Sequence, residues 1–233
     1  MNKVELTSLR RHSHTLTASL RTLRTNIQFC GDNVRTILFT SAVPDEGKST
    51  VVMDLARSIA EADKKVLVID SDMRKSLLIG RMKVQSVNGN KIYGLSHYLS
   101  GQQSMDAVFC STDVPNLFMI FSGPTVPNPT EILEKEYFAR LMKFAREHFD
   151  YVLVDCAPLG AAIDAAVIGV HCDAAILVVA QGTTSSRILN AAKKQLEMSG
   201  VKILGTILNK VNMKKNSYYG KYYGNYYGHY EKG

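Results

Sequence analysis

The chain of 233 residues has a net charge of +7, with 45% hydrophobic and 21% charged residues, which predicts one large domain with appendages rather than two small ones. Its longest apolar run, residues 174–180, is far below the roughly 20 residues of a membrane span, and its polar N-terminus excludes a signal peptide, so we expect a cytoplasmic protein. The positive charge suits a nucleic acid, an anionic membrane face or a phosphorylated ligand and selects none of them.

Apolar, β-branched runs alternate with helical patterns along the chain. We expect strands over 34–41, 64–70, 116–123, 150–158, 173–180 and 201–211, and helical patterns over 48–63, 129–149 and 185–200, the last ending at Gly200. Before the first strand, residues 19–29 are a candidate amphipathic helix that packs on the flank of the domain. Strands alternating with helices predict an α/β fold with a mostly parallel central sheet covered by helices on both faces.

The cysteines show no pattern typical of a metal site. Cys30, Cys110, Cys156 and Cys172 include no Cys-x-x-Cys pair and have no nearby histidine at zinc spacing. A cytoplasmic protein keeps such thiols reduced. We therefore expect free thiols.

The first predicted strand is followed by a loop typical of phosphate binding. Residues 42–50 read AVPDEGKST, which fits G-x-x-x-x-G-K-[ST] except that Ala42 replaces the first glycine. In such a loop, backbone N–H groups and a helix N-terminus point at phosphate oxygens. Lys48 would contact the β- and γ-phosphates, and the hydroxyl of Ser49 would ligate Mg²⁺. The predicted nucleotide-binding residues here are Pro44, Asp45, Glu46, Gly47, Lys48, Ser49 and Thr50.

Two further strands are predicted to end in aspartates. Asp70 and Asp72 follow the run VLVI, and Asp155 follows YVLV in a Walker B pattern. Because ligands of an open α/β sheet bind at the carboxyl ends of its strands, we expect these carboxylates to converge with Lys48. The predicted Mg²⁺ ligands are Ser49, Asp70 and Asp155.

Residues that this chain lacks reduce the number of P-loop protein classes to which it could belong. Among P-loop proteins, GTPases recognise guanine with Asn-Lys-x-Asp, but Asn209 and Lys210 are followed by Asn212 at the acidic position. Partition ATPases have a lysine early in the loop, where this chain has Val43. These residues argue against a GTPase and weaken the interpretation as a partition ATPase, whereas metabolic P-loop enzymes and P-loop tyrosine kinases meet no such objection.

The C-terminal segment NSYYGKYYGNYYGHYEKG repeats Tyr-Tyr-Gly-x with a period of four. It has no aliphatic residue after Lys214 and is rich in glycine, so we expect a disordered tail whose tyrosines lie in water. By itself this composition fits an aromatic tract for nucleic acid or aggregation, a strand-like edge, or hydroxyl groups presented to an enzyme. The hydroxyls are those of Tyr218, Tyr219, Tyr222, Tyr223, Tyr226, Tyr227 and Tyr230.

Taken together, these motifs resemble the bacterial tyrosine kinases, a P-loop family unrelated to eukaryotic kinases, and in particular the separate cytoplasmic kinase of capsular and exopolysaccharide assembly systems. The resemblance spans nearly the whole chain. It rests on AVPDEGKST, VLVIDSDMR, YVLVDCAP, the segment SGPTVPNPTEIL at 122–133, LRTNIQF at 23–29 and the tyrosine cluster. It divides the chain into an N-terminal helical segment over 1–33, a kinase domain over 34–211 and a flexible tail over 212–233.

The resemblance implies a reaction and its residues. ATP and Mg²⁺ would be held by the Walker motifs, with Lys48, Asp70 and Asp72 catalytic. Asp70 would assist in activating a tyrosine hydroxyl, and Asp72 would lie beside it in the metal shell. The tail would be the kinase's own substrate, phosphorylated largely between subunits. As additional contacts, we expect Asn209 to meet the adenine and Arg74 to meet a phosphate or a partner.

The resemblance also implies partners. The first is the cytoplasmic tail of a membrane-embedded activator or polysaccharide co-polymerase, which would recruit the kinase to the inner face of the membrane. The others are a cognate phosphotyrosine phosphatase and further copies of the chain in a ring or smaller oligomer. No nucleic acid is expected. Ala18 stands where ring-forming relatives commonly have a glutamate, although Arg21 and Arg24 of the same motif are present.

Two rival functions predict different behaviour. A partition-type regulatory ATPase would hydrolyse ATP without forming phosphotyrosine. A nucleic-acid-binding module that stacks bases on tyrosines would bind with a steep salt dependence, unaffected by Lys48→Met.

Overall fold

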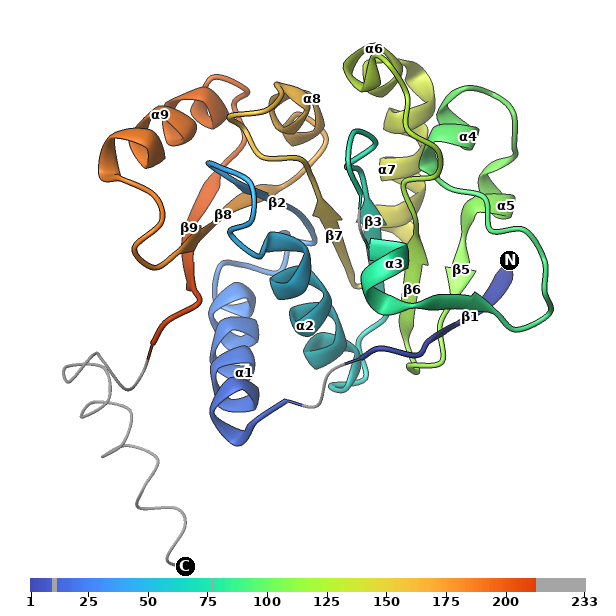
Figure 1. The fold of residues 1–233 in the computed structure, drawn as a ribbon, viewed down its shortest axis with the longest axis horizontal. Helices are drawn as coiled ribbons and strands as arrows, with labels where there is room; N and C mark the ends of the chain where they lie inside the picture. The colour runs from blue at the N-terminus through green and yellow to red at the C-terminus, as the bar shows by residue number, and fades with distance from the viewer. Residues whose placement is uncertain (10–11, 77, 213–233) are drawn as a thin grey trace, which may run out of the picture.

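The computed structural model describes residues 1–9, 12–76 and 78–212, so the predicted tail and its tyrosines 218–230 lie outside the described residues. Within this part, a nine-stranded sheet has the order β4-β1-β5-β6-β3-β7-β2-β8-β9 (Figure 1). Its pairs are parallel except β1–β4 and β5–β6. The strands are β1 Asn2–Leu6, β2 Thr36–Ser41, β3 Val66–Asp70, β4 Val84–Ser86, β5 Cys110–Ser111, β6 Leu117–Ile120, β7 Tyr151–Asp155, β8 Ala174–Ala180 and β9 Ile203–Asn209.

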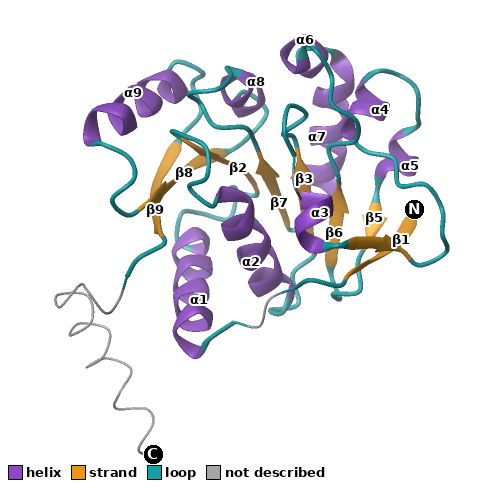
Figure 2. Cartoon of the chain, viewed as in Figure 1, coloured by secondary structure: helices purple, strands orange, loops and turns teal. Residues whose placement is uncertain are grey.

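Helices cover both faces of the sheet, which confirms the predicted α/β architecture (Figure 2). Successive residues of a strand point to opposite faces, so Ile37 and Phe39 pack with α1 and α2, whereas Leu38 packs on the other side with α7, α8 and α9. The helices are α1 His14–Gln28, α2 Lys48–Ala60, α3 Leu78–Met82, α4 Leu95–Leu99, α5 Met105–Val108, α6 Pro129–Leu133, α7 Glu136–His148, α8 Asp164–Gly169 and α9 Ser186–Glu197.

The six predicted strands are all present as β2, β3, β6, β7, β8 and β9, with ends shifted by a few residues. The single helical pattern over 129–149 is wrong, since it forms two helices. They separate at Lys135, whose extended backbone (φ −73°, ψ 156°) begins α7. No glycine or proline marks this break in the sequence.

The N-terminal segment contains the predicted helix, α1, and also a strand that the sequence did not predict. Strand β1 pairs with β5 and β4, so residues 1–33 contribute to the sheet as well as to its flank. Helix α1 begins after Ser13, whose hydroxyl accepts a hydrogen bond from the N–H of Leu16. Arg24 donates from its guanidinium to the carbonyl of Ser58 and so joins α1 to α2.

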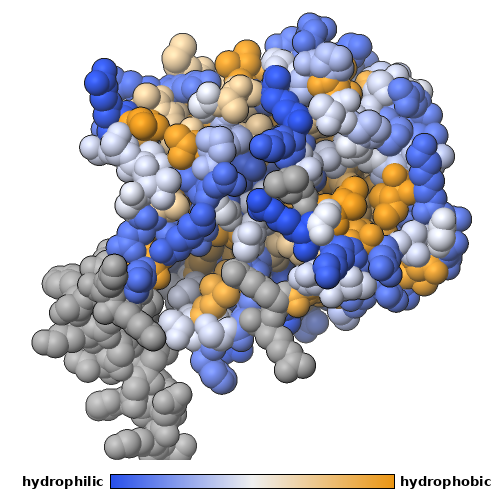
Figure 3. Space-filling view, in the orientation of Figure 1, coloured by the Kyte–Doolittle hydropathy of each residue, from blue (hydrophilic) through white to orange (hydrophobic). Residues whose placement is uncertain are grey.

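The hydrophilic surface and the free cysteines agree with what the sequence predicts. In the space-filling view, hydrophilic residues predominate on the face shown and apolar residues form smaller groups (Figure 3). The cysteines at 30, 110, 156 and 172 are free thiols, as predicted. No helix in the described ranges has the length and apolar character needed to cross a membrane.

Candidate functional site

The predicted phosphate loop joins β2 to α2 at the carboxyl edge of the sheet. Its backbone turns through Asp45 at φ +61° and Gly47 at φ +85°, both in the left-handed region. A Cβ on Gly47 would lie 2.3 Å from the amide nitrogen of Asn209, so any side chain would collide there. The conformation and this contact both require glycine.

The carboxylate of Glu46 holds the loop from inside the protein. Its residue is 1% exposed, and its oxygens accept hydrogen bonds from the N–H groups of Ala42 and Val43, at 2.9 and 3.1 Å. They also accept from the N–H of Ala180 at 3.1 Å and the hydroxyl of Thr184 at 2.7 Å. Glu46 was predicted as a nucleotide contact, but its side chain shapes the loop and only its backbone is left to meet a phosphate.

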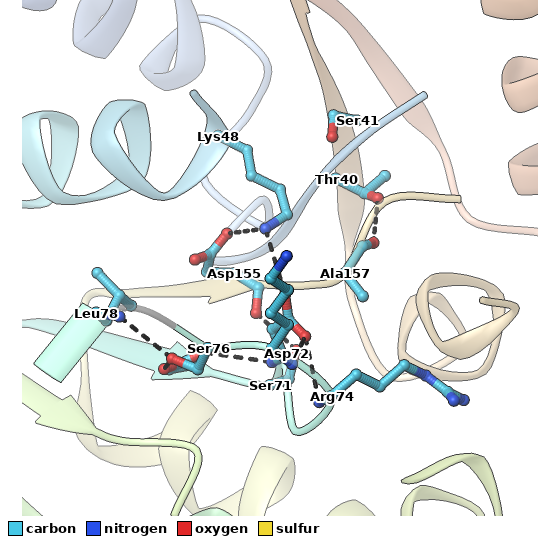
Figure 4. Close-up of polar contacts among 12 residues, drawn as sticks. Thr40, Ser41, Lys48, Ser71, Asp72, Arg74, Ser76, Leu78, Asp155 and Ala157 are labelled. Carbon is cyan, nitrogen blue, oxygen red and sulfur yellow. Dashed lines mark hydrogen bonds and ion pairs between the residues drawn. The ribbon is translucent and has the colours of Figure 1, made fainter. Parts of the chain in front are cut away.

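Lys48 begins α2 and extends toward two of the predicted carboxylates (Figure 4). Its Nζ lies 3.5 Å from Oδ1 of Asp155 and 3.9 Å from Oδ2 of Asp72. Burial disfavours the charged amine, yet these carboxylates raise the pKa of Lys48 above its usual value. The lysine therefore stays charged in the cavity, ready to exchange carboxylates for phosphate oxygens.

Asp70 and Asp155 are paired residues on the neighbouring strands β3 and β7. Burial, together with the nearby charge of Asp155, raises the pKa of Asp70 to about 7. Its oxygens accept hydrogen bonds from the hydroxyl of Ser76 and from the N–H of Asp72. Burial also raises the pKa of Asp155, against the effect of Lys48.

These groups line one cavity of about 200 Å³ between the phosphate loop and the loop after β3. Of the predicted residues, Thr50 and Asn209 do not line it. Asn209 instead donates from its side chain to the carbonyl of Glu46, at 2.9 Å. The predicted residues that do line it are Pro44, Asp45, Glu46, Gly47, Lys48, Ser49, Asp70, Asp72, Arg74 and Asp155.

Three lining residues that follow Asp72 were not predicted as site residues. Lys75, Ser76 and Arg81 line the cavity on the side of α3. Lys75 and Ser76 follow Asp72 within the run VLVIDSDMRKS, but no role was assigned to them, and Arg81 lies outside that run.

The carboxylates fit a divalent cation. Oδ1 of Asp155 is buried, and its ion pair with Nζ of Lys48 at 3.5 Å is too long for a well-formed hydrogen bond, so Mg²⁺ or one of its waters would satisfy this oxygen. No group of three or more histidine, cysteine or acidic side chains in the described ranges is arranged to hold a metal. This donor set suits Mg²⁺, which uses one or two carboxylates together with phosphate oxygens and water.

Comparison with known proteins places this geometry in a family. The AAA domain family matches residues 35–218. The tyrosine-protein kinase CpsD of Streptococcus pneumoniae is 43% identical over 196 residues, which are 84% of this chain and 85% of that protein. The kinase domain of the Escherichia coli tyrosine kinase ETK has a TM-score of 0.78 at 33% identity, over 84% of this chain and 75% of that one.

A more distant likeness concerns the fold alone. The septum site-determining protein MinD of Pyrococcus horikoshii, solved with Mg-ADP, has a TM-score of 0.63 at 24% identity, over 78% of this chain and 72% of that one. The P-loop fold is thus shared with ATPases, whereas the close relatives are tyrosine kinases. The chain belongs to the bacterial P-loop family of tyrosine-protein kinases.

Proposed function

We propose that the chain is an ATP-dependent kinase that transfers the γ-phosphoryl group of ATP to tyrosines of its own C-terminal cluster. One observation supports this most: Lys48, Asp72 and Asp155 meet within 3.9 Å beside a phosphate loop, with Asp70 next to Asp155. The tyrosine-kinase relatives favour this function over that of a partition-type ATPase.

The position of each side chain suggests its role in the reaction. The N–H groups of the phosphate loop and the charge of Lys48 bind the β- and γ-phosphates and compensate the charge that spreads over the transferred group. The tyrosine oxygen attacks the γ-phosphorus, ADP leaves, and the phenolic proton needs an acceptor. Asp70, next to Asp155 at the end of β3, is the residue that we propose to assist by accepting this proton.

Ser49, Asp155 and Asp70 would hold Mg²⁺, with Asp72 next to them. When bound, the ion would supply positive charge that compensates the negative charge of the phosphates. The protein's part is to keep these oxygens together at one cavity, where the buried Oδ1 of Asp155 could exchange its ion pair with Lys48 for the metal ion.

The partners follow from the family and are part of the proposal. The kinase would regulate capsular or exopolysaccharide synthesis and export. The cytoplasmic tail of a membrane-embedded activator would recruit the kinase to the inner face of the membrane. The kinase would also associate with further copies of itself, and a phosphotyrosine phosphatase would remove the phosphates. This setting is what the family resemblance implies, and the names of relatives such as CpsD support the kinase activity itself.

The test is phosphotyrosine formation. The protein is incubated with ATP and Mg²⁺, with and without the fused cytoplasmic peptide of a candidate activator, and analysed by intact mass and peptide mapping. Phosphates should appear on tyrosines 218–230 of the wild type and be absent from Lys48→Met. Lys193→Met is a matched control, since Lys193 is exposed on α9 and pairs with Glu197; it should behave as wild type. ATP turnover without a mass shift would contradict the proposal and favour the regulatory ATPase.

A further inference from the structure

The segment 122–133 was part of the family resemblance, yet the proposed function gives it no task. The structure places it against the loop that follows β3. The N–H of Val126 donates to the carbonyl of Met73 at 3.3 Å. Thr130, in the first turn of α6, reaches the next residue of that loop, because its hydroxyl accepts a hydrogen bond from Arg74 at 3.3 Å.

Arg74 is held by a buried carboxylate. Its Nε lies 2.9 Å from Oδ2 of Asp164 and its Nη2 3.1 Å from Oδ1, a bidentate pair. The hydroxyl of Thr130 donates to the same Oδ1 at 2.5 Å. Figure 4 shows the guanidinium of Arg74 pointing away from Lys48, although Arg74 also lines the cavity, and its contact with a phosphate or a partner remains a prediction.

Breaking the ion pair between Arg74 and Asp164 would be energetically unfavourable. Asp164 is 1% exposed at the start of α8, and a buried carboxylate that loses its cation is strongly unfavourable. Bidentate arginine–carboxylate pairs also fix geometry, because both N–H groups must stay aligned with both oxygens. Asp164 therefore fixes where Arg74 lies.

The backbone next to this pair contacts the catalytic carboxylates. The N–H groups of Arg74 and Lys75 donate to Oδ1 of Asp72, at 3.3 and 3.0 Å. The N–H of Asp72 in turn donates to Oδ1 of Asp70, at 3.2 Å. A continuous set of hydrogen bonds thus runs from Asp164 through Arg74 to both aspartates.

We propose that Asp164, with Thr130, is a positioning residue of the kinase reaction: by clamping Arg74 it holds the loop over 70–76 in the conformation that aims Asp70 and Asp72 into the cavity. The task of segment 122–133 is then to supply Thr130 and the Val126 contact. This inference rests on the proposed function, but its first test does not require phosphate transfer.

The first test measures hydrogen exchange in the ligand-free protein. In Asp164→Asn, the amides of Asp72, Arg74 and Lys75 should exchange about tenfold faster or more. Local opening of the loop costs less free energy in this variant, because the Arg74–Asp164 ion pair is already absent. Asp173→Asn is the matched control: Asp173 pairs with Arg146 and accepts from the N–H groups of Arg35 and Thr36, at the amino end of β8, away from the cavity. It should leave exchange of the three amides unchanged.

The second test compares steady-state kinetics of phosphate transfer. Asp164→Asn should lower kcat about 10- to 100-fold, as removal of partners behind catalytic ligands commonly does. The KM for ATP should stay within about twofold, because the phosphate loop and Lys48 are untouched. Asp173→Asn should keep the wild-type kcat even if it lowers the melting temperature.

The outcomes separate the inference from the proposed function. If the wild type transfers no phosphate, the proposed function fails, and amide exchange still decides the clamp. Wild-type exchange and wild-type kcat in Asp164→Asn would overturn the inference, as would equal losses of kcat in Asp164→Asn and Asp173→Asn. If Asp164→Asn does not fold, Thr130→Val decides: it removes one hydroxyl from the clamp and should lower kcat several-fold, and an unchanged kcat would refute the role.

Discussion

Replacing Glu46 by glutamine tests whether its buried carboxylate shapes the phosphate loop. The change keeps the size of the side chain but turns one acceptor oxygen into a donor. Either the loop N–H groups of Ala42 and Val43, or the N–H of Ala180, would then face an N–H₂ group. The hydroxyl of Thr184 can rotate and accept, so its contact survives.

The expected loss of unfolding free energy follows from the number of hydrogen bonds that each variant loses. A hydrogen bond to a charged acceptor contributes about 1.5–3 kcal/mol, so Glu46→Gln should lower the free energy of unfolding by about 2–3 kcal/mol. Glu46→Ala leaves the N–H groups of Ala42, Val43 and Ala180 without their acceptor and should cost about 3–6 kcal/mol. Both variants should also bind nucleotide more weakly, because the loop loses its internal support.

Urea unfolding and titration with a fluorescent nucleotide measure the two effects. Asp45→Asn is the control for stability, since it makes the same carboxylate-to-amide change at the adjacent, exposed position. It should change the free energy of unfolding by no more than about 0.5 kcal/mol. If Glu46→Gln were as stable as Asp45→Asn and bound nucleotide like the wild type, the structural role given to Glu46 would be wrong.

Further predictions concern Gly47 and Asp70. Gly47→Ala should weaken nucleotide binding by about 1–3 kcal/mol, because φ is +85° and the side chain would meet Asn209; an unchanged affinity in the same titration would contradict this. In metal-free protein, the folded Asp70 carboxyl keeps its proton up to a pH of about 7, whereas the unfolded one loses it near pH ~4. Its stabilising contribution is thus fully present below pH ~4 and lost as pH rises to about 7, so Asp70→Asn should flatten the fall of unfolding free energy between about pH 4 and 7. Since Mg²⁺ competes with that proton, its apparent affinity in calorimetry should fall about tenfold per pH unit below 7, and a constant affinity would count against Asp70 as a ligand.

The parts of the fold that were predictable are those with a local signal. Strands such as β3 and β8 are buried on both faces, so their sequences are nearly continuous apolar runs. The short strands β1, β4 and β5 could not be predicted, because β1 alternates exposed and buried residues over only five positions and the other two are shorter still. Their existence depends on pairing between residues far apart in sequence.

The same distinction applies to the site. Lys48, Asp70 and Asp155 were predictable because each stands at a fixed offset from a strand end, and the structure brings them together. The internal role of Glu46 was not predictable, since Thr184, one of its partners, lies 138 residues further along the chain. Nor was Asp164, which follows a run of small residues and matches no motif that we used.

The way the last described strand ends bears on how the tyrosine cluster can be removed experimentally. Beyond β9, Lys210 donates from its amine to the carbonyl of Asp45, and the N–H of Asn212 donates to the side chain of Gln181. Asn209 and Lys210 thus hold the phosphate loop through the carbonyls of Glu46 and Asp45. A stop codon before residue 209 would therefore delete two supports of the phosphate loop along with the acceptor segment, and its inactivity would be misattributed to the missing tyrosines. A tail-less enzyme that still binds nucleotide should retain the residues through Lys210.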